Sequence, residues 1–374
     1  MPSTYYSYQD ICLKPKYSIH PSRADISVAV ELGQRGFKIP VIPANMACTI
    51  NTELASWMSQ NDYFYIMHRF NVDHSHPVNQ DNMAFVKLAN EQRWNTISIS
   101  IGVQEDDKNF LRWIIENDYM VDYITIDIAH AHSVRMKEML SFIHGLTFRS
   151  RISPHLIDGE RVEYESTLPP MYMPFVIAGN VATPEACNDL AAWGADCVKV
   201  GIAQGDACTT YGQTGFGLPM FTCVQECAKV CPVPIIADGG IRLNGDFAKA
   251  IVAGGHIVMA GSIFAACKDS PAETVERTAF TGYGTEKFKT TEFGGYYVSE
   301  CEETTVKKTF KVYYGSASAK NKGVSKHIEG RVVELPCNGM TYAEKLSEIT
   351  ESLQSSISYS GGNLSGAEWA IINK

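Results

Sequence analysis

The stretch 234-PIIADGGIRLNGDFAKAIVAGGHIVMAGS-262 decides the fold. It contains two short apolar runs, 234–237 and 257–260, separated by an amphipathic segment at 245–253. Short runs rich in Ile and Val are typical of strands buried on both faces, and parallel strands are joined by a helix. Glycine and polar residues follow each run. The stretch therefore predicts a βαβ unit with polar groups gathered at the carboxyl ends of its strands.

Six further runs of this kind alternate with predicted helices elsewhere in the chain. Eight such repeats over about 220 residues approach the ~250 residues typical of a TIM (β/α)8 barrel. A doubly wound open sheet is the alternative. We predict an α/β barrel, as a single domain over residues 1–374, with its active face at the strand ends. The other strands are predicted at 39–43, 63–67, 97–103, 123–129, 175–178 and 197–200, and the helices at 52–61, 106–117, 133–143, 184–193, 221–230 and 245–253, with Asn51, Thr183 and Asn244 as N-caps.

Two segments interrupt this alternation. Residues 147–170 are longer than a barrel connection requires, and we predict an extended loop there. Residues 277–311 follow the eighth strand and predict an insertion, either a β-hairpin or a disordered loop. A last amphipathic helix is predicted at 342–353, before a Ser/Gly-rich tail at 355–362.

The composition excludes several classes of protein. The 374 residues are 45% hydrophobic and 20% charged, as in soluble globular chains, and the net charge of −9 gives no general attraction for nucleic acid or anionic membranes. No apolar run reaches the ~18 residues of a membrane span, and we expect no secretory signal. The 11 cysteines are odd in number and scattered, so we expect reduced thiols in a cytoplasmic protein.

The loop 201-GIAQGDACTT-210 contains the first candidate catalytic residues. Cys208 lies in a glycine-flanked loop, where backbone N–H groups can lower a thiol pKa, although cysteine is as often a small packed hydrophobe. Thr210 can pass protons to a leaving group when a carboxylate supports it. The loop therefore predicts a nucleophile with a proton relay.

Glycines after the last two predicted strands indicate an anion site. Asp238, Gly239 and Gly240 follow one strand, and Gly261 and Ser262 follow the next. Backbone N–H groups of the seventh and eighth loops commonly form the phosphate site of a TIM barrel. Asp238 could accept from ribose hydroxyls, whereas two tight turns are the alternative explanation.

Two other groups of residues are weaker candidates for a metal site. His130 and His132 could bind zinc, but the sequence offers no clear third and fourth ligands. Cys223, Cys227 and Cys231 have helical spacing, and a buried helix face explains them better than a metal site.

Over nearly the whole chain, outside the two insertions, the order of these blocks resembles the IMP dehydrogenase and GMP reductase family. Segments 61–70 and 353–362 are similar to the reductase branch. The chain has no paired-CBS insertion, and the region after Tyr314 lacks the Arg-Tyr pair with which the dehydrogenases activate water. The blocks that carry the resemblance are PANM at 43–46, FVIAGN at 175–180, the loop at 200–210, IADGGIR at 236–242, VMAGS at 258–262, YGSAS at 314–318 and EG at 329–330.

The resemblance implies NADPH-dependent reductive deamination of GMP to IMP and ammonia, in purine salvage. Cys208 would form a thioimidate at purine C2, and Thr210 and Glu329 would supply protons. A homotetramer, a potassium ion at Gly205 and Cys208, and an active-site flap over 314–340 are also implied. Substrate would be bound by Asp238, Gly239, Gly240, Gly261, Ser262, Gly315, Ser316, Ala317, Lys326 and Gly330, and the cofactor by Arg69, Asp127, Ser355, Ser356 and Ser358, with Ser22 and Arg23 of a neighbouring subunit.

Asp206 departs from the family pattern. It stands where the resemblance implies a phosphate-binding serine, and a carboxylate there would repel a phosphate. Three alternatives therefore stay open: an oxidoreductase acting on a modified or differently phosphorylated purine, a non-catalytic purine-nucleotide sensor, and a metal-dependent hydrolase using His130 and His132.

Overall fold

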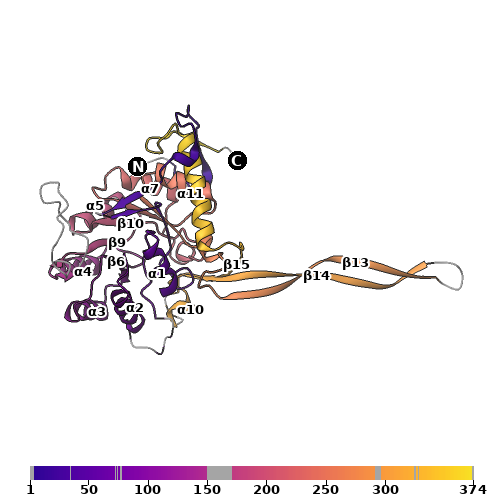
Figure 1. Cartoon of the computed structure of the whole chain (residues 1–374), viewed down its shortest axis with the longest axis horizontal. Coiled ribbons are helices and arrows are strands. Elements are labelled where there is room, and N and C mark those ends of the chain that lie inside the picture. The colour runs from indigo at the N-terminus through magenta and orange to yellow at the C-terminus, as the bar shows by residue number, and fades with distance from the viewer. Residues whose placement is uncertain are drawn as a thin grey trace.

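An α/β body carries a long two-stranded hairpin that extends away from it (Figure 1). The computed structural model describes residues 4–33, 35–71, 73, 75, 78–149, 171–290, 296–323, 326 and 328–372. None of the helices in these ranges is long and apolar enough to cross a membrane.

Seven parallel strands form the central sheet, in the order β4-β12-β11-β10-β9-β6-β5. Neighbours in the sheet follow one another along the chain, and the first strand, β4, pairs with the last, β12. A doubly wound sheet reverses its strand order at a switch point, so that alternative is wrong. The strands are β4 (Val41–Pro43), β5 (Ser98–Ile101), β6 (Tyr123–Asp127), β9 (Phe175–Val181), β10 (Cys197–Val200), β11 (Ile235–Asp238) and β12 (Ile257–Ala260).

Residues 63–67, predicted as a strand, are buried except for the partly buried Tyr63, but they are not part of the sheet ladder. The segment lies beside β5, at one edge of the sheet. The Met67 amide donates to the Ser98 carbonyl (3.2 Å), and the Ser100 hydroxyl donates to the Met67 carbonyl (2.5 Å). The observed sheet is therefore curled and seven-stranded.

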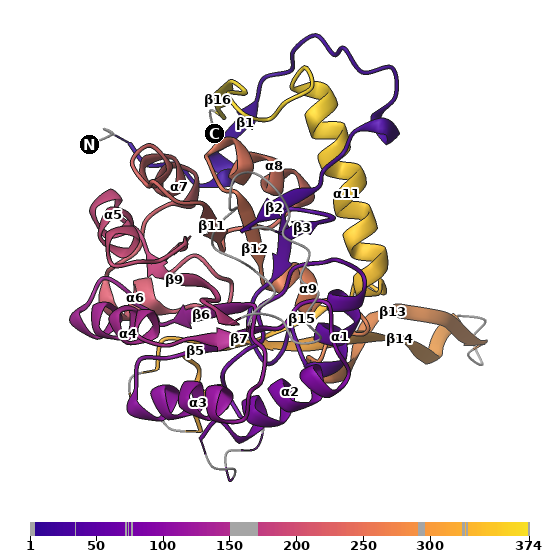
Figure 2. The ribbon, with the colours of Figure 1, turned by 60° about the vertical axis from the view of Figure 1, so that its left-hand side comes forward.

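Helices surround the curled sheet (Figure 2). The Asn51 side chain accepts the Leu54 amide in the first turn of α1, and the Thr183 side chain accepts the Ala186 amide in the first turn of α5, which confirms both predicted N-caps. Asn244 is instead the first residue of α8, and the Asp246 carboxylate accepts the Leu243 amide (3.0 Å). The helices are α1 (Thr52–Gln60), α2 (Gln80–Glu91), α3 (Glu105–Glu116), α4 (Val134–His144), α5 (Pro184–Ala192), α6 (Thr210–Thr214), α7 (Met220–Ala228), α8 (Asn244–Val252), α9 (Ser262–Ala265), α10 (Ala319–Lys322) and α11 (Tyr342–Tyr359).

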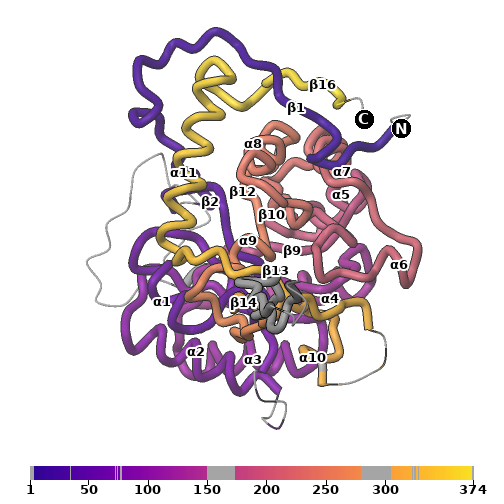
Figure 3. The backbone as a smooth tube through the Cα atoms, turned by 90° about the vertical axis from the view of Figure 1, so that its right-hand side faces the viewer, coloured from indigo at the N-terminus to yellow at the C-terminus, as the bar shows by residue number. Residues whose placement is uncertain are grey.

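The hairpin consists of β13 (Thr274–Thr290) and β14 (Tyr296–Tyr314), which pair antiparallel; Figure 3 looks along it. At its base β15 (Val332–Pro336) adds a third strand beside β14. It occupies the region of the predicted 277–311 insertion, of which 291–295 lie outside the described residues. Most of the predicted loop 147–170, from residue 150 onward, also lies outside them.

Helix α11 is longer than predicted and includes most of the expected Ser/Gly tail. Its buried stripe of Leu346, Ile349 and Leu353 continues to the partly buried Ile357, and packing of this stripe extends the helix. Strand β1 pairs with β16, which brings the two ends of the chain together. The remaining elements are η1 (Tyr8–Asp10), β1 (Ile11–Leu13), η2 (Arg23–Asp25), β2 (Val30–Leu32), β3 (Arg35–Phe37), β7 (Phe148–Arg149), β8 (Met171–Tyr172) and β16 (Trp369–Ile371).

Candidate active site

A cavity of about 370 Å³ lies at the carboxyl ends of the central strands. Parallel α/β sheets place their binding sites at this edge. The cavity brings together twelve of the residues singled out in the sequence, from segments far apart along the chain. They are Arg69, Asp127, Gly205, Cys208, Thr210, Asp238, Gly239, Gly261, Gly315, Ser316, Ala317 and Glu329.

Backbone hydrogen bonds hold the Cys208 loop against the segment that carries Glu329. The Cys208 amide donates to the Gly205 carbonyl (3.0 Å), and the Thr209 amide donates to the Glu329 carbonyl (2.8 Å). Cys208 and Gly330 also form an isolated antiparallel bridge. The residues that carry the thiol and the carboxylate, Cys208 and Glu329, are therefore joined by backbone hydrogen bonds.

The side chains of Cys208, Thr210 and Glu329 form a hydrogen-bonded chain. The Cys208 thiol lies 3.2 Å from Thr210 Oγ1, and this hydroxyl donates to Glu329 Oε2 at 2.7 Å. Each of the three is partly exposed and lines the cavity. A proton can pass from the Cys208 thiol through the Thr210 hydroxyl to the Glu329 carboxylate. This transfer leaves a nucleophilic thiolate and a protonated carboxylic acid, joined through two hydrogen bonds.

A nearly buried lysine, which the sequence analysis did not single out, also lines the cavity. Lys199 is only 2% exposed, and its Nζ lies 2.8 Å from Asp127 Oδ1 and 2.7 Å from Asp238 Oδ2. Burial alone would lower the pKa of Lys199, but the two carboxylates raise it above its usual value. Burial alone would raise the pKa of Asp127, but Lys199 and Arg69 lower it. The sequence does contain an indication of this role, because Lys199 lies within CVKV, a strand predicted to be buried on both faces.

The Asp206 carboxylate is turned toward Arg242 rather than into the cavity. Asp206 Oδ1 and Arg242 Nη1 form an ion pair, and the Arg331 guanidinium donates to the Asp206 carbonyl. Asp206 is absent from the residues that line the cavity. The carboxylate thus neutralises the arginine that follows the glycine pair Gly239 and Gly240.

Nine of the predicted site residues do not line the cavity. Among them, Arg23 contacts α11 of its own chain: its guanidinium lies 3.5 Å from Ser355 Oγ and stacks on the Tyr359 ring at 4.9 Å. Ser358 also lies there, with its hydroxyl 3.0 Å from that of Ser18. The nine residues are Gly240, Ser262, Lys326, Gly330, Ser22, Arg23, Ser355, Ser356 and Ser358.

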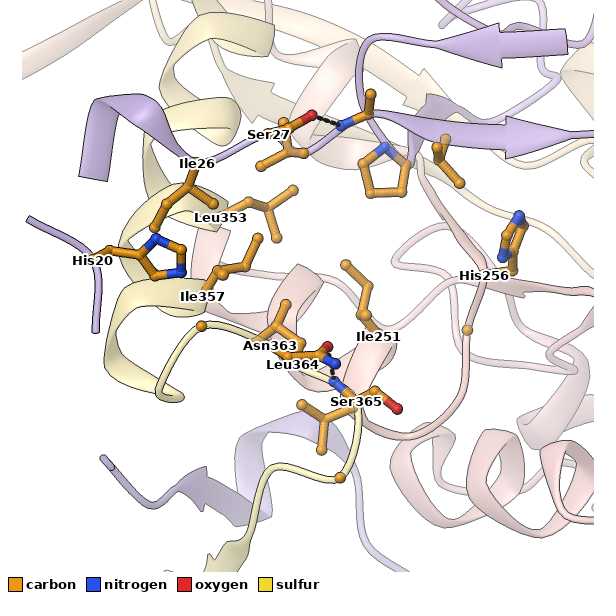
Figure 4. Close-up of a pocket in the computed structure, with 18 of the residues that line it drawn as sticks. His20, Ile26, Ser27, Ile251, His256, Leu353, Ile357, Asn363, Leu364 and Ser365 are labelled. Carbon is orange, nitrogen blue, oxygen red and sulfur yellow. Dashed lines mark hydrogen bonds between the residues drawn. The ribbon is translucent and has the colours of Figure 1, made fainter. Parts of the chain in front are cut away.

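A second cavity of about 530 Å³ lies between the N-terminal segment, the end of α8 and the end of α11 (Figure 4). Aliphatic side chains such as Ile26, Ile251 and Leu353 line it, together with His20 and His256. Its described lining holds acid–base groups, His20, Asp25 and His256, but no cysteine. Of these two cavities, only the one around Cys208 therefore combines a thiol with a carboxylate.

The weaker metal hypotheses find no geometry to support them. The His132 ring nitrogen Nε2 lies 2.8 Å from Asp189 Oδ2, and the ring stacks on Trp193. Within the described ranges, no group of three or more His, Cys, Asp and Glu side chains is placed to hold a metal ion. Cys223 and Cys227 are buried on α7, as predicted for a helix face, but Cys231 lies beyond the end of this helix and is only partly buried.

Known proteins resemble this chain over most of its length. The relatives include proteins called GMP reductase from Mycoplasma mycoides subsp. mycoides, 38% identical over 96% of this chain and 93% of the relative, and from Acidovorax sp., 38% identical over 96% and 91%. A GMP reductase of Shouchella clausii is 39% identical over 97% of this chain and 92% of its own length. The IMP dehydrogenase / GMP reductase domain matches residues 5–167 and 164–365. The chain therefore belongs to the IMP dehydrogenase / GMP reductase family.

Proposed function

We propose that this protein reduces GMP to IMP and ammonia with NADPH, through a covalent bond between Cys208 and purine C2. The observation that carries the proposal is the chain from Cys208 through Thr210 to Glu329 in the strand-end cavity. The relatives called GMP reductase support the choice of substrate. We assign the reaction to purine salvage in the cytoplasm.

The proposed first step adds the sulfur and removes the amine. The Cys208 thiol gives its proton through Thr210 to Glu329, and the thiolate attacks C2. The protonated Glu329 returns the proton through Thr210 to the departing amino group, which leaves as ammonia. Covalent catalysis replaces one difficult displacement at an aromatic carbon by two easier steps.

Bound NADPH would supply the hydride that replaces the sulfur at C2 and regenerates the thiolate. Arg69 and Asp127 fit its nicotinamide half, since both line the cavity that contains Cys208. The Arg69 Nε donates to the Asp127 carbonyl at 3.2 Å, which fixes the guanidinium at the cavity wall. Asp238, Gly239, Gly261, Gly315 and Ser316 would hold the nucleotide on the other side.

We further propose that a second copy of the chain completes the cofactor site, in a homotetramer. Ser22, Arg23, Ser355, Ser356 and Ser358 gather around α11 but do not line the Cys208 cavity of their own chain. Subunit complementation tests this directly. Mixed oligomers of inactive Cys208→Ala and Arg23→Ala chains should recover activity, whereas a monomeric active protein would refute it.

The central test follows both the adduct and the turnover. Mixing the protein with GMP and NADPH should give GMP-dependent loss of nicotinamide absorbance, and GMP alone should add mass at Cys208. Cys208→Ala should abolish both signals, whereas Glu329→Gln should slow turnover and retain the thiol. A folded wild-type protein without GMP-dependent oxidation of NADPH would refute the proposal.

The Asp206–Arg242 ion pair favours a second candidate, an oxidoreductase for a purine whose 5′ group is altered. Arg242 is already neutralised, which weakens its attraction for a 5′-phosphate. Comparing guanosine, dGMP and GMP separates the candidates, because best turnover on GMP eliminates the second. A nucleotide sensor would instead show ligand-induced thermal stabilisation without turnover or adduct.

Three structural assignments belong to the same proposal. Residues 63–67 would fill the eighth barrel position, supported by their burial beside β5. Residues 314–340, of which 324, 325 and 327 lie outside the described residues, would cover the bound base. The flap would belong to one domain over 1–374.

Potassium at Gly205 and Cys208 has weaker support, because the Gly205 carbonyl already accepts the Cys208 amide. Activity in potassium against lithium salts tests it.

A further inference from the structure

Lys199 binds two carboxylates that line the cavity, those of Asp127 and Asp238. Its strand, β10, lies next to β11, which ends at Asp238, and β9 separates it from β6, which ends at Asp127. The ammonium lies within 2.8 Å of a carboxylate oxygen of each. One cation therefore fixes the separation between two acidic side chains that come from different strands.

Burying a lone ammonium costs several kcal/mol, so Lys199 is stable there only as part of this cluster. The charged groups around it are Asp127, Asp238 and Arg69. The neutral Asn180 amide adds a second contact, donating to Asp238 Oδ2 at 2.8 Å and to the Gly201 carbonyl at 2.7 Å. Lys199 thus holds both carboxylates, and Asn180 adds a second contact to Asp238.

The hydrogen bonds leave Asp238 one free oxygen. Lys199 and Asn180 both bind Oδ2, and no described residue donates to Oδ1. Asp238 lines the cavity, so Oδ1 can accept from a ligand hydroxyl. Lys199 thereby orients the carboxylate so that its free edge serves the bound molecule.

We propose that Lys199 is a positioning residue that couples the nucleotide side and the cofactor side of the cavity. The inference rests on the proposed function, in which Asp238 contacts the nucleotide and Asp127 the cofactor. In this proposal Lys199, although it lines the cavity, acts through these two carboxylates, because its ammonium is bound to both of them. Loss of Asp238 should weaken one ligand and loss of Asp127 the other, whereas loss of Lys199 should weaken both.

The test measures KM for GMP and for NADPH in Lys199→Met, Lys199→Arg, Asp127→Asn and Asp238→Asn. Lys199→Met should raise both KM values at least tenfold, and Lys199→Arg should restore part of each. Asp238→Asn should raise mainly the KM for GMP, and Asp127→Asn mainly that for NADPH. A change in only one KM, or in kcat alone, with Lys199→Met would overturn the proposal.

The pH profile gives a readout that a merely structural lysine would not move. Removing the cation raises the pKa of Asp127, because Lys199 and Arg69 together hold it below its usual value. The other charged or titratable groups around the cluster are Asp238, Arg69 and the phenols of Tyr8 and Tyr313. The acid limb of kcat/KM should therefore move to higher pH by about one unit. An unchanged acid limb in Lys199→Met would contradict the assignment.

Lys249→Met is the matched control. Lys249 is also largely buried, binding the Tyr8 carbonyl (2.8 Å) and Asp246 (3.1 Å), but it lies outside the cavity. Its loss should lower stability and leave both KM values and the pH profile unchanged.

If Lys199→Met does not fold, the double variant Lys199→Met/Asp127→Asn removes one of the two carboxylates that would be left without their cation. Its KM for NADPH should then match that of Asp127→Asn, and a further tenfold rise would refute coupling through Asp127. Wild-type protein that fails to oxidise NADPH with GMP would refute the proposed function, whereas an active wild type with unaffected Lys199 variants would refute only this inference.

Discussion

Gly330→Ala is the sharpest test of the framework behind Cys208. A Cβ at this position would lie 2.8 Å from the Ser318 amide nitrogen and 3.1 Å from the Ala317 carbonyl carbon. Both are backbone atoms, so no flexible side chain can move aside. Overpacking of this kind costs about 1–3 kcal/mol of unfolding free energy. We expect a loss in that range, measured by urea unfolding.

The same substitution should also lower turnover. Glu329 precedes Gly330, and its carboxylate depends on a 2.7 Å hydrogen bond from Thr210. A displacement of about 1 Å at a reacting group can cost about 10²-fold in rate. We therefore expect a fall of that order in kcat on GMP, without loss of the Cys208 thiol.

Gly245→Ala is the control. Gly245 lies in α8, where an added Cβ meets no atom within 4 Å, and helical Ala is more stable than Gly by about 0.5–1 kcal/mol. This variant should be more stable and fully active. Equal stability and turnover of the Gly330→Ala and wild-type proteins would refute the close packing on which the argument rests.

Three other predictions are also checked by turnover on GMP or by urea unfolding. Glu329→Gln should lower turnover by about 10²–10⁴-fold, because an amide cannot take up the thiol proton, while alkylation of Cys208 by iodoacetamide continues; a change below threefold would contradict the relay. Burial lowers the pKa of His68 to about 4, against ~6.5 unfolded, so about 3 kcal/mol of stability should be lost as pH falls from 6.5 to 4. The unfolding free energy of His68→Gln, measured in urea, should lack this loss. The prediction is refuted if the wild type and the variant lose the same unfolding free energy over this pH range. Asp246→Asn should cost about 3 kcal/mol, because the buried carboxylate binds Gln9, the Leu243 amide and Lys249; a wild-type urea midpoint would count against that network.

The sequence was sufficient to locate most of the central strands. β10 and β12 begin and end where predicted, because strands buried on both faces read as continuous apolar runs. Residues 63–67 have the same composition and burial but lie outside the ladder, and composition cannot distinguish these two outcomes. The Asn244 cap was wrong because the Asp246 carboxylate, two residues later, binds the Leu243 amide instead.

The cavity was predictable where local sequence carries the chemistry. Cys208, Thr210 and Asp238 each follow a strand, and parallel strands bring such ends together. Lys199 was not predicted, because its role depends on carboxylates from two other strands. The Asp206–Arg242 pairing was equally hidden, since only the folded loops show which cation faces the carboxylate.

The register between β14 and β15 has a consequence for how this chain could acquire its long arm. Tyr314 pairs with Val332, so this one residue pair joins the two ends of the segment that carries Gly315 and Glu329. Residues added at the far end of the hairpin leave the Tyr314–Val332 pair unchanged, because new strand pairs form beyond those already present. Evolution can thus lengthen or shorten the hairpin in steps while the separation between the two ends of the 315–331 segment stays constant.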